Sequence, residues 1–236
     1  MLRSAIYLIC LFSFVTNYII PCSAKDPNLN ECAKKHGQES LQDILKGDPK
    51  YKIPNMTPLN LPEIMFTSGN LSVHLENVVV LGLEYSKIKE INMDLSKRHI
   101  SVAILIDNVN LISDYNINGS ILILPITGNG RANITFVGGE YRFDFDYVLN
   151  DKRDGQYMEI MNDTLTYKTK RSYYHFENLF GGNRALGEHM NTFLNEHWED
   201  VQDDIGPALT KTISAIVKAT LGGVISRVPF QEMFRP

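Results

Sequence analysis

The residues that could support acid–base, nucleophilic or metal chemistry are scattered along the chain. His189 and His197 share one face of a predicted helix, but two helical turns separate them, which is too far for joint ligation of a metal ion. Glu199-Asp200 and Asp203-Asp204 are typical of a solvated helix face. The remaining histidines are dispersed: His36, His74, His99 and His175. We therefore predict no catalytic residue, no metal site and no cofactor.

Motifs of common enzyme classes do not occur either. The chain has no G-x-S-x-G element, no H-E-x-x-H and no P-loop. Gly128-Asn129-Gly130 resembles a glycine-rich phosphate turn, but no suitable helix follows it, so we interpret it as a hairpin turn. The formal net charge is −4 and no basic run appears, which argues against nucleic acid as a partner. Apolar residues make up 44% of the chain, enough for a real core and hence for a globular protein. The missing catalytic motifs predict that it is not an enzyme.

Apolar surface is what the chain offers in place of catalytic groups. Either the apolar residues form a simple core, or they line an elongated cavity for a small hydrophobic ligand. In the second case tyrosine hydroxyls would orient the ligand and methionine would adapt to its shape. We take the second interpretation for one face of a predicted strand and for the face of a predicted helix that we expect to lie opposite it. The candidate ligand-binding residues are Tyr141, Phe143, Phe145, Tyr147, Met190, Phe193, Leu194 and Trp198.

The elements that must position these residues follow from the period of the apolar pattern. Residues 70–176 alternate with a period of two, which predicts an antiparallel meander. From Asn183 onward the period is helical for about forty residues, with a kink expected at Gly206-Pro207. One long apolar stripe needs an equally long apolar trough, so the sheet must curl around the helix. The turns between the predicted strands are Asn118-Gly119, Gly128-Asn129-Gly130, Gly138-Gly139 and Asp154-Gly155.

The fold class is therefore α+β, with a long, strongly curved antiparallel sheet wrapped around one long C-terminal helix. A shorter helix from Cys32 to Leu45 precedes the strands and ends at Gly47-Asp48-Pro49. Residues 49–62 contain four prolines and are expected to be an extended connector. Neither half could bury its apolar face alone, so we predict a single domain over residues 21–236.

The N-terminus predicts export. Arg3 precedes an apolar run over residues 5–15, too short to cross a bilayer but typical of a signal peptide, which we place at residues 1–20. Cleavage after Ala24 would discard Cys22, whereas an earlier cleavage would keep it. We favour the earlier site, because it leaves Cys22 and Cys32 as an even pair that can form a disulfide in an oxidising compartment.

Five N-x-S/T sequons predict N-glycosylation of an exported chain. Asn118, beside Gly119, is the best turn candidate among them, and Asn133 is expected within a strand. The acceptor residues are Asn55, Asn70, Asn118, Asn133 and Asn162.

Three stretches of the chain resemble the insect takeout and haemolymph juvenile-hormone-binding proteins. They are the Cys22–Cys32 segment, residues 114–130, and residues 178–198. The resemblance covers residues 22–236 and implies a β-wrap around a long helix, an internal hydrophobic tunnel, secretion, and the binding of lipophilic small molecules. It also implies that Cys22 survives processing. The chain has no cysteine after Cys32, which favours the takeout-like branch and leaves juvenile hormone in doubt as the ligand.

The sequence as a whole predicts a secreted, monomeric carrier of a small lipophilic ligand such as juvenile hormone, another isoprenoid or a fatty acid. A lipid-transfer protein that contacts membranes transiently is the first alternative. A secreted interaction module without a physiological ligand is the second.

Overall fold

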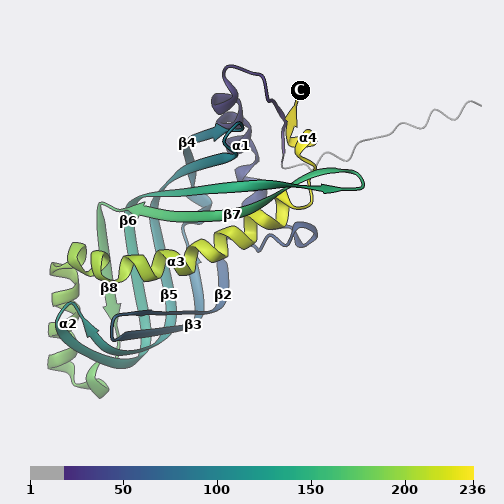
Figure 1. The fold of residues 1–236 in the computed structure, drawn as a ribbon. Coiled ribbons are helices and arrows are strands. Elements are labelled where there is room, and N and C mark those ends of the chain that lie inside the picture. The colour runs from purple at the N-terminus through teal and green to yellow at the C-terminus, as the bar shows by residue number, and fades with distance from the viewer. Residues whose placement is uncertain (1–18) are drawn as a thin grey trace, which may run out of the picture.

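The structure, a computed structural model, describes residues 19–236. Residues 1–18, and with them most of the predicted signal peptide, lie outside the described residues. A large antiparallel sheet curls around a long helix, α3 (Trp198–Ile225), which runs across the face of the sheet (Figure 1). The predicted fold class is confirmed.

Seven strands form the sheet, and the two longest organise it. β5 (His99–Ile121) and β6 (Leu124–Lys152) pair with each other along their whole length. The strand order is β2-β3-β5-β6-β7, while β4 also pairs with β5 and β8 with β6. Besides pairing with each other, β5 and β6 each pair with two further strands, so the sheet divides into two wings, one with β2, β3 and β8 and one with β4 and β7. The remaining strands are β2 (Leu59–Ser68), β3 (Leu71–Leu81), β4 (Lys87–Asp94), β7 (Gly155–Lys168) and β8 (Arg171–Phe176).

Three of the four predicted turns are wrong, because they lie inside β5 and β6. Asn118-Gly119 pairs within β5, and both Gly128-Asn129-Gly130 and Gly138-Gly139 lie within β6. A glycine in a strand can instead leave room for a neighbouring segment. At Gly128 that segment contains Leu179, whose Cα would lie 2.9 Å from a Cβ on residue 128. The β5–β6 turn falls at Leu122-Ile123, inside an apolar run. The turn before Gly155 is confirmed, since it joins β6 to β7.

The long helical pattern is two helices rather than one kinked helix. α2 (Arg184–Glu196) ends at His197, whose φ of −105° and ψ of 33° interrupt the helix before α3 begins. Pro207 lies inside α3, which continues through it without a break, and a kink there stays a prediction. Pro207 and Asp203 are both exposed, so water can satisfy the carbonyl that proline deprives of its N–H donor.

Shorter elements close the two ends of the molecule. α1 (Leu29–Leu45) and α4 (Phe230–Met233) lie at the end opposite α2 (Figure 1). Gly47 follows α1 and has a φ of 83°, a left-handed conformation that often ends a helix. The predicted end of this helix at Gly47 is confirmed. The connector over residues 49–62 contains the 3-10 turn η1 (Pro49–Tyr51) and runs into the edge strand β2. The other short elements are β1 (Cys22–Ser23), η2 (Leu83–Tyr85), η3 (Phe180–Gly182) and β9 (Phe234–Arg235).

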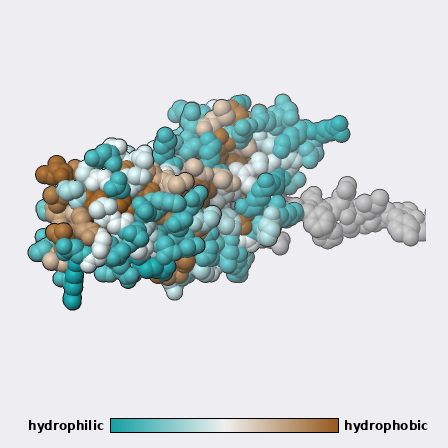
Figure 2. Space-filling view, turned by 90° about the horizontal axis from the view of Figure 1, so that it is seen from below, coloured by the Kyte–Doolittle hydropathy of each residue, from teal (hydrophilic) through white to brown (hydrophobic). Residues whose placement is uncertain are grey.

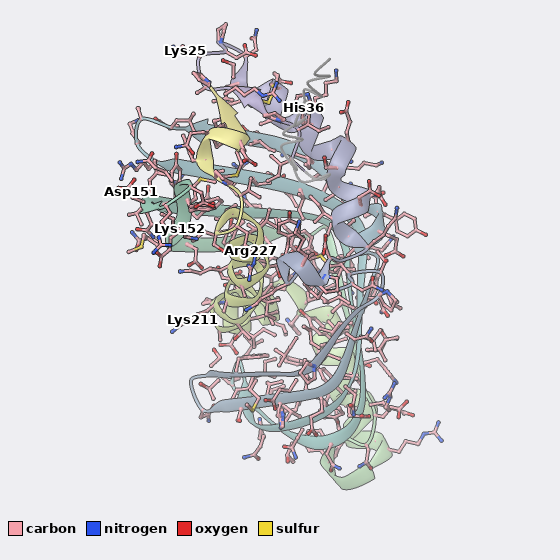
Figure 3. The ribbon with its side chains drawn as sticks, turned by 90° about the vertical axis from the view of Figure 1, so that its right-hand side faces the viewer. Lys25, His36, Asp151, Lys152, Lys211 and Arg227 are labelled. Carbon is pink, nitrogen blue, oxygen red and sulfur yellow. A yellow bond between two sulfur atoms is a disulfide. The ribbon has the colours of Figure 1, made fainter. Side chains whose placement is uncertain are left out.

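Basic side chains complete the C-terminal end of α3. The Lys152 ammonium donates to the Ser226 carbonyl oxygen at 2.8 Å, and the Arg227 guanidinium donates to the Gly223 carbonyl oxygen at 2.7 Å (Figure 3). Cations are favourable at this end because the last carbonyls of a helix carry partial negative charge. Lys152 thereby attaches the end of α3 to β6.

Among the described residues, α3 is the one helix that is long and apolar enough to suit a membrane span by length and composition. It lies here against the sheet, yet only 22% of its most apolar window is buried. Between Leu209 and Gly223, Ser214 is the one buried residue of α3. The middle of the helix is therefore loosely covered by the sheet.

Two hydrophobic clusters fill the space between the sheet and the helices. The α2-side cluster joins β2, β3, β5 and β8 to α2 and the start of α3, and includes Leu71, Leu194 and Val201. The C-terminal cluster joins β6 and β7 to the end of α3 and to α4, and includes Phe143 and Val228. Each cluster belongs to one wing of the sheet, and α3 contributes to both.

Candidate ligand-binding site

An apolar cavity of about 70 Å³ lies between α3 and the wing of the sheet that contains β2, β3 and β8. No polar atom contributes to its wall. β2, β3, β5, β6 and β8 supply side chains from below, and α2 and α3 supply them from above. The lining residues include Phe66, Leu71, Ile134, Phe136, Ile205, Leu209 and Ile213. Such a wall suits an apolar molecule and offers no anchor for a charge.

Five of the eight predicted ligand-binding residues lie in the α2-side cluster. Leu194 lines the cavity, and Met190 is buried in the same cluster. Tyr141, Phe193 and Trp198 are partly buried against that cluster.

The structure places the other three, Phe143, Phe145 and Tyr147, in the C-terminal cluster instead. β6 passes from one wing to the other between Tyr141 and Phe143, so alternate residues of one strand serve different clusters. The prediction that all four strand residues oppose residues 190–198 is therefore wrong. Their role as ligand contacts stays a prediction.

Sequence reasoning did not nominate several residues that border the cavity. Ile205, Leu209 and Ile213 follow one another at steps of four, so the helical stripe contained the signal for them. Tyr174 and Phe176 alternate on β8 and line the cavity as well. Tyr167, opposite Tyr141 in the β6–β7 pairing, is a further residue that the pattern did not single out.

Burial controls the protonation of the tyrosines beside the cavity. It raises the pKa of Tyr167 to about 12, and the negative charge of Asp203 acts in the same direction. Burial also raises the pKa of Tyr141 and of Tyr174, and the Tyr167 hydroxyl adds to both shifts. These hydroxyls therefore remain neutral hydrogen-bond donors over the physiological pH range.

Two asparagines of α2 position β8 beneath the cavity. The Asn195 side chain accepts from the Tyr174 N–H at 3.0 Å and donates to the Tyr174 carbonyl at 2.7 Å. Asn191 makes the same pair of bonds with Phe176, at 2.9 Å each. One helical turn rises about as far as two strand residues, so residues four apart on the helix match residues two apart on the strand. The backbone N–H and carbonyl groups of Tyr174 and Phe176, which face the open edge of β8, thereby gain hydrogen-bond partners.

α3 is attached over the sheet by a polar clamp on β7. Asp163 accepts hydrogen bonds from the Ser214 hydroxyl at 2.7 Å and from the Lys218 ammonium at 2.9 Å. Burial alone would raise the pKa of Asp163, but these two bonds outweigh it and hold the pKa below its ordinary value. The clamp therefore requires the ionised carboxylate.

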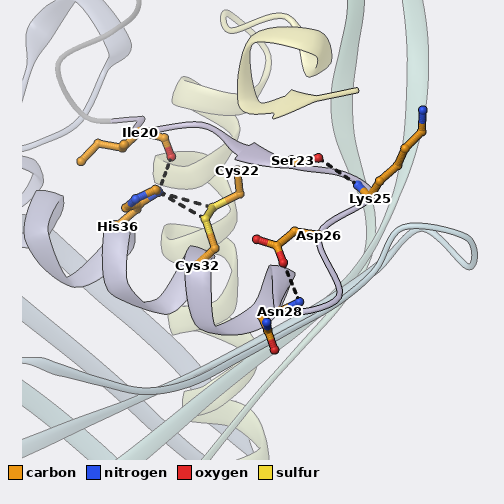
Figure 4. Close-up of a disulfide and its surroundings, with 8 residues drawn as sticks. All are labelled: Ile20, Cys22, Ser23, Lys25, Asp26, Asn28, Cys32 and His36. Carbon is orange, nitrogen blue, oxygen red and sulfur yellow. Dashed lines mark hydrogen bonds between the residues drawn. A yellow bond between two sulfur atoms is a disulfide. The ribbon is translucent and has the colours of Figure 1, made fainter.

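The predicted disulfide between Cys22 and Cys32 is confirmed (Figure 4). His36 Nδ1 lies 3.3 Å from Cys22 Sγ and 3.1 Å from the Ile20 carbonyl oxygen, so it also contacts the segment before Cys22. Among residues 19–236, these two cysteines and His36 form the one cluster with metal-ligand spacing. Both sulfur atoms are in the disulfide, so neither is a thiolate that could bind a metal ion.

A larger hollow of about 710 Å³ lies on the outside of the molecule, between α1 and the β4–β5 region. It is open to solvent, and polar groups such as Gln38, Glu84 and Lys87 line it. Despite its size it lacks the enclosed apolar wall that a lipophilic molecule needs. The smaller internal cavity is therefore the better candidate site.

All five predicted glycosylation acceptors are exposed. Asn118 lies inside β5 rather than in a turn, which corrects that prediction, and Asn133 lies within β6 as expected. The amide nitrogen of Asn162 donates to Asp146 at 3.4 Å. Exposure is compatible with modification at each position, and glycosylation itself stays a prediction.

A sheet that wraps a long helix and leaves an apolar cavity between them defines a class of β-wrap proteins with an apolar interior. The chain belongs to the haemolymph juvenile hormone binding protein family, whose model matches residues 5–235. This is a family of binding proteins, and the predicted resemblance is confirmed.

Individual relatives agree with this assignment. The circadian clock-controlled protein daywake of Drosophila yakuba is 26% identical over 245 aligned residues, covering 95% of this chain and 94% of that protein. The juvenile hormone-binding protein of Manduca sexta is 24% identical and covers 62% of each chain. The crystal structure of Epiphyas postvittana Takeout 1 shares the fold, with a TM-score of 0.82, 24% identity, and coverage of 92% of this chain and 99% of that one.

Proposed function

We propose that this protein is a secreted carrier that holds a small lipophilic ligand between the sheet and α3. The observation that carries the proposal is the wholly apolar wall of the internal cavity. Burying apolar area supplies about 25 cal/mol per Å², so an isoprenoid-sized molecule needs no charge pairing to bind.

The ligand occupies more than the cavity of about 70 Å³, because sites for drug-sized ligands measure roughly 300–1,000 Å³. The extra space comes from the loosely covered middle of α3, where Ile216, Val217 and Leu221 are half-buried. Val217 and Leu221 pack against the C-terminal cluster. An elongated ligand under α3 would therefore reach from Leu194 to Phe143 and contact residues of both clusters.

The family supports a lipophilic ligand and leaves its identity open. The relative from Manduca sexta is by name a juvenile hormone-binding protein. For this chain we propose the broader class, comprising juvenile hormone, other isoprenoids and fatty acyl compounds. Secretion and glycosylation are parts of the same proposal, supported by the exposed sequons and the disulfide. We also propose that the carrier is a monomer.

Filling the cavity tests the proposal. Leu209 is 8% exposed and lines the cavity, so Leu209→Trp should occupy the space and weaken the binding of a hydrophobic fluorophore by about tenfold or more. Leu186→Trp is the matched control, because Leu186 is 51% exposed on α2. Circular dichroism checks that both variants fold. Equal binding by both variants would place the fluorophore outside the cavity and contradict the proposal.

Lipid transfer with transient membrane contact is a second candidate, favoured by one surface feature. Ile123, at the apolar β5–β6 turn, is 89% exposed. Figure 2 shows hydrophobic side chains gathered at the end of the molecule that carries α2, where Leu186 is also exposed. Ile123→Ser should slow ligand uptake from phospholipid vesicles while leaving affinity for dissolved ligand unchanged. An uptake rate independent of both vesicle concentration and this substitution would eliminate the second candidate.

A further inference from the structure

The solvent-open hollow between α1 and the β4–β5 region exists because two strands pair with different parts of β5. β3 last pairs with β5 at Leu81 and Asn110, and β4 first pairs with it at Lys87 and Leu105. Within the described part of the chain, residues 106–109 therefore have no strand partner on this edge of β5. The connection through η2 bridges the gap, and α1 supplies one wall. A crevice between separating strands is a place where sheet proteins can hold a ligand.

Several polar side chains of this crevice are held by one hydrogen bond and keep a second polar atom for a ligand. Gln38 Oε1 accepts from the Ile88 N–H at 2.7 Å, and Gln42 Nε2 donates to the Glu84 carbonyl oxygen at 2.9 Å. The Glu84 carboxylate accepts from the Gly82 N–H at 3.0 Å through Oε2. Gln38 Nε2, Gln42 Oε1 and Glu84 Oε1 have no partner among residues 19–236. The crevice therefore presents donors and acceptors in fixed positions.

Tyr85 adds a flat apolar surface to these polar groups. It lines the crevice and is 67% exposed. Asp107 and Asn108, from the unpaired stretch of β5, line the same crevice, and their side chains have no partner in the part of the chain that the structure describes. An exposed aromatic ring beside amides and carboxylates matches a pyranose, which has an apolar C–H face and hydroxyls that both donate and accept hydrogen bonds.

We propose that this crevice binds a neutral saccharide. Tyr85 packs against the C–H face of one pyranose ring, while Asp107 and Asn108 form hydrogen bonds with its hydroxyls. The volume of about 710 Å³ lies within the roughly 300–1,000 Å³ of sites for drug-sized molecules, a size that includes disaccharides. The site is separate from the cavity beneath α3 and goes beyond the proposed carrier function.

The charges of the crevice disfavour an anionic ligand. Glu84 and Asp107 contribute two carboxylates, against one ammonium from Lys87. A sulfated or phosphorylated molecule would therefore meet a net negative charge. A hydrocarbon would cover the amides and carboxylates without forming hydrogen bonds with them. A neutral polyhydroxylated molecule avoids both costs.

The saccharide can come from two sources, and one of them is attached to this chain. The Asn110 side-chain nitrogen donates to Asn133 Oδ1 at 2.6 Å and to Thr135 Oγ1 at 2.8 Å. Asn110 lines the crevice, and Asn133 is the acceptor of the sequon that ends at Thr135. A glycan on Asn133 would therefore begin beside the crevice. The other source is a glycan of another molecule, which offers the same pyranose chemistry.

Saturation-transfer NMR on the full chain, expressed in insect cells, tests the crevice. Chitobiose and maltose are the neutral probes, and glucose sulfate is the anionic one. At least one neutral probe should bind with a Kd of about 1–10 mM, as expected for an open site. Tyr85→Ala and Asn108→Ala should each weaken this binding by about fivefold or more. Met161→Ala is the control, because Met161 is 51% exposed on β7. All three positions are exposed, so the variants should fold, which circular dichroism checks.

Asn133→Asp distinguishes the two sources, because it removes the sequon and keeps an oxygen acceptor for Asn110. If the glycan of this chain occupies the crevice, the free probes should bind this variant about fivefold or more tightly than the wild type. Equal binding assigns the crevice to a glycan of another molecule.

Three results would overturn the proposal. The first is that neither neutral probe binds the wild type or Asn133→Asp, and the second is that glucose sulfate binds most tightly. The third is an affinity that Tyr85→Ala and Asn108→Ala both leave unchanged. Displacement of a hydrophobic fluorophore by the bound saccharide would also contradict it, because the saccharide would then lie in the cavity beneath α3.

Discussion

At the scale of single residues, buried phenols make the protein sensitive to alkali. Tyr115 and Tyr167 have pKa values raised to about 12, chiefly by burial, and those of Tyr141 and Tyr174 are raised further. An unfolded tyrosine ionises near its ordinary pKa of 10.0. The stability that these groups contribute is therefore complete below about pH 10 and is lost as pH rises toward 12.

We expect the phenolate absorbance to rise in two phases as the pH increases. Exposed tyrosines should titrate first, and the buried ones should ionise cooperatively with the loss of the circular dichroism signal. Tyr167→Phe should move this unfolding step to higher pH, whereas Tyr173→Phe should leave it in place. A single phase near pH 10 with the fold intact would contradict the burial of these hydroxyls.

At the scale of elements, α2 stabilises the sheet through its asparagines. Asn195→Ala removes the partners of both the Tyr174 N–H and the Tyr174 carbonyl, so it should cost about 2–4 kcal/mol of unfolding free energy. Urea denaturation measures the loss, and hydrogen exchange of the Tyr174 amide should become faster. Thr192→Ala, an exposed change on the same helix, should cost less than about 0.5 kcal/mol. Equal effects of the two changes would show that the bonds to β8 contribute little.

The clamp between α3 and β7 should make stability fall in acid. The pKa of Asp163 is held below its ordinary value in the folded protein, so its contribution is complete above about pH 4 and is lost as pH falls through the folded pKa. Asp163→Asn should lower stability at neutral pH by about 1–3 kcal/mol and flatten the acid limb of a plot of stability against pH. This variant retains the sequon at Asn162. A wild-type acid limb unchanged by the substitution would assign the acid sensitivity to other carboxylates.

At the scale of the whole molecule, the ligand should fill the space between the sheet and the loosely covered middle of α3. α3 bridges both clusters, and its middle is only loosely covered. Filling this space should give a negative heat-capacity change on binding and slow hydrogen exchange between residues 209 and 225. Exchange in α1, which packs mainly against β4, should change less and serves as the internal control. Uniform slowing across the chain would indicate global stabilisation instead.

Much of the fold was predictable because its elements have clear periods. Leu71, Val73 and Leu75 alternate on a strand, and Ile205, Leu209 and Ile213 repeat on a helix, so the curved sheet around a helix follows from matching apolar surfaces. Glycine was the main source of error. Gly128 and Gly139 resemble turn residues in the sequence. Gly128 instead provides room for Leu179, which is distant along the chain, and Gly139 provides room for the ring of Tyr141 on the same strand.

The sequence by itself determined the class of the protein, since the apolar periods, the Cys22–Cys32 pair and the family motifs are all local. Only the tertiary structure decided which apolar residues share a compartment. It separated Phe143 from Leu194, and it brought Tyr167 beside Tyr141 under α3. The physical reason is that burial and hydrogen-bond satisfaction depend on what lies opposite a side chain. Strand register and the helix break at His197 determine which residues lie opposite one another, and neither can be read from the apolar period.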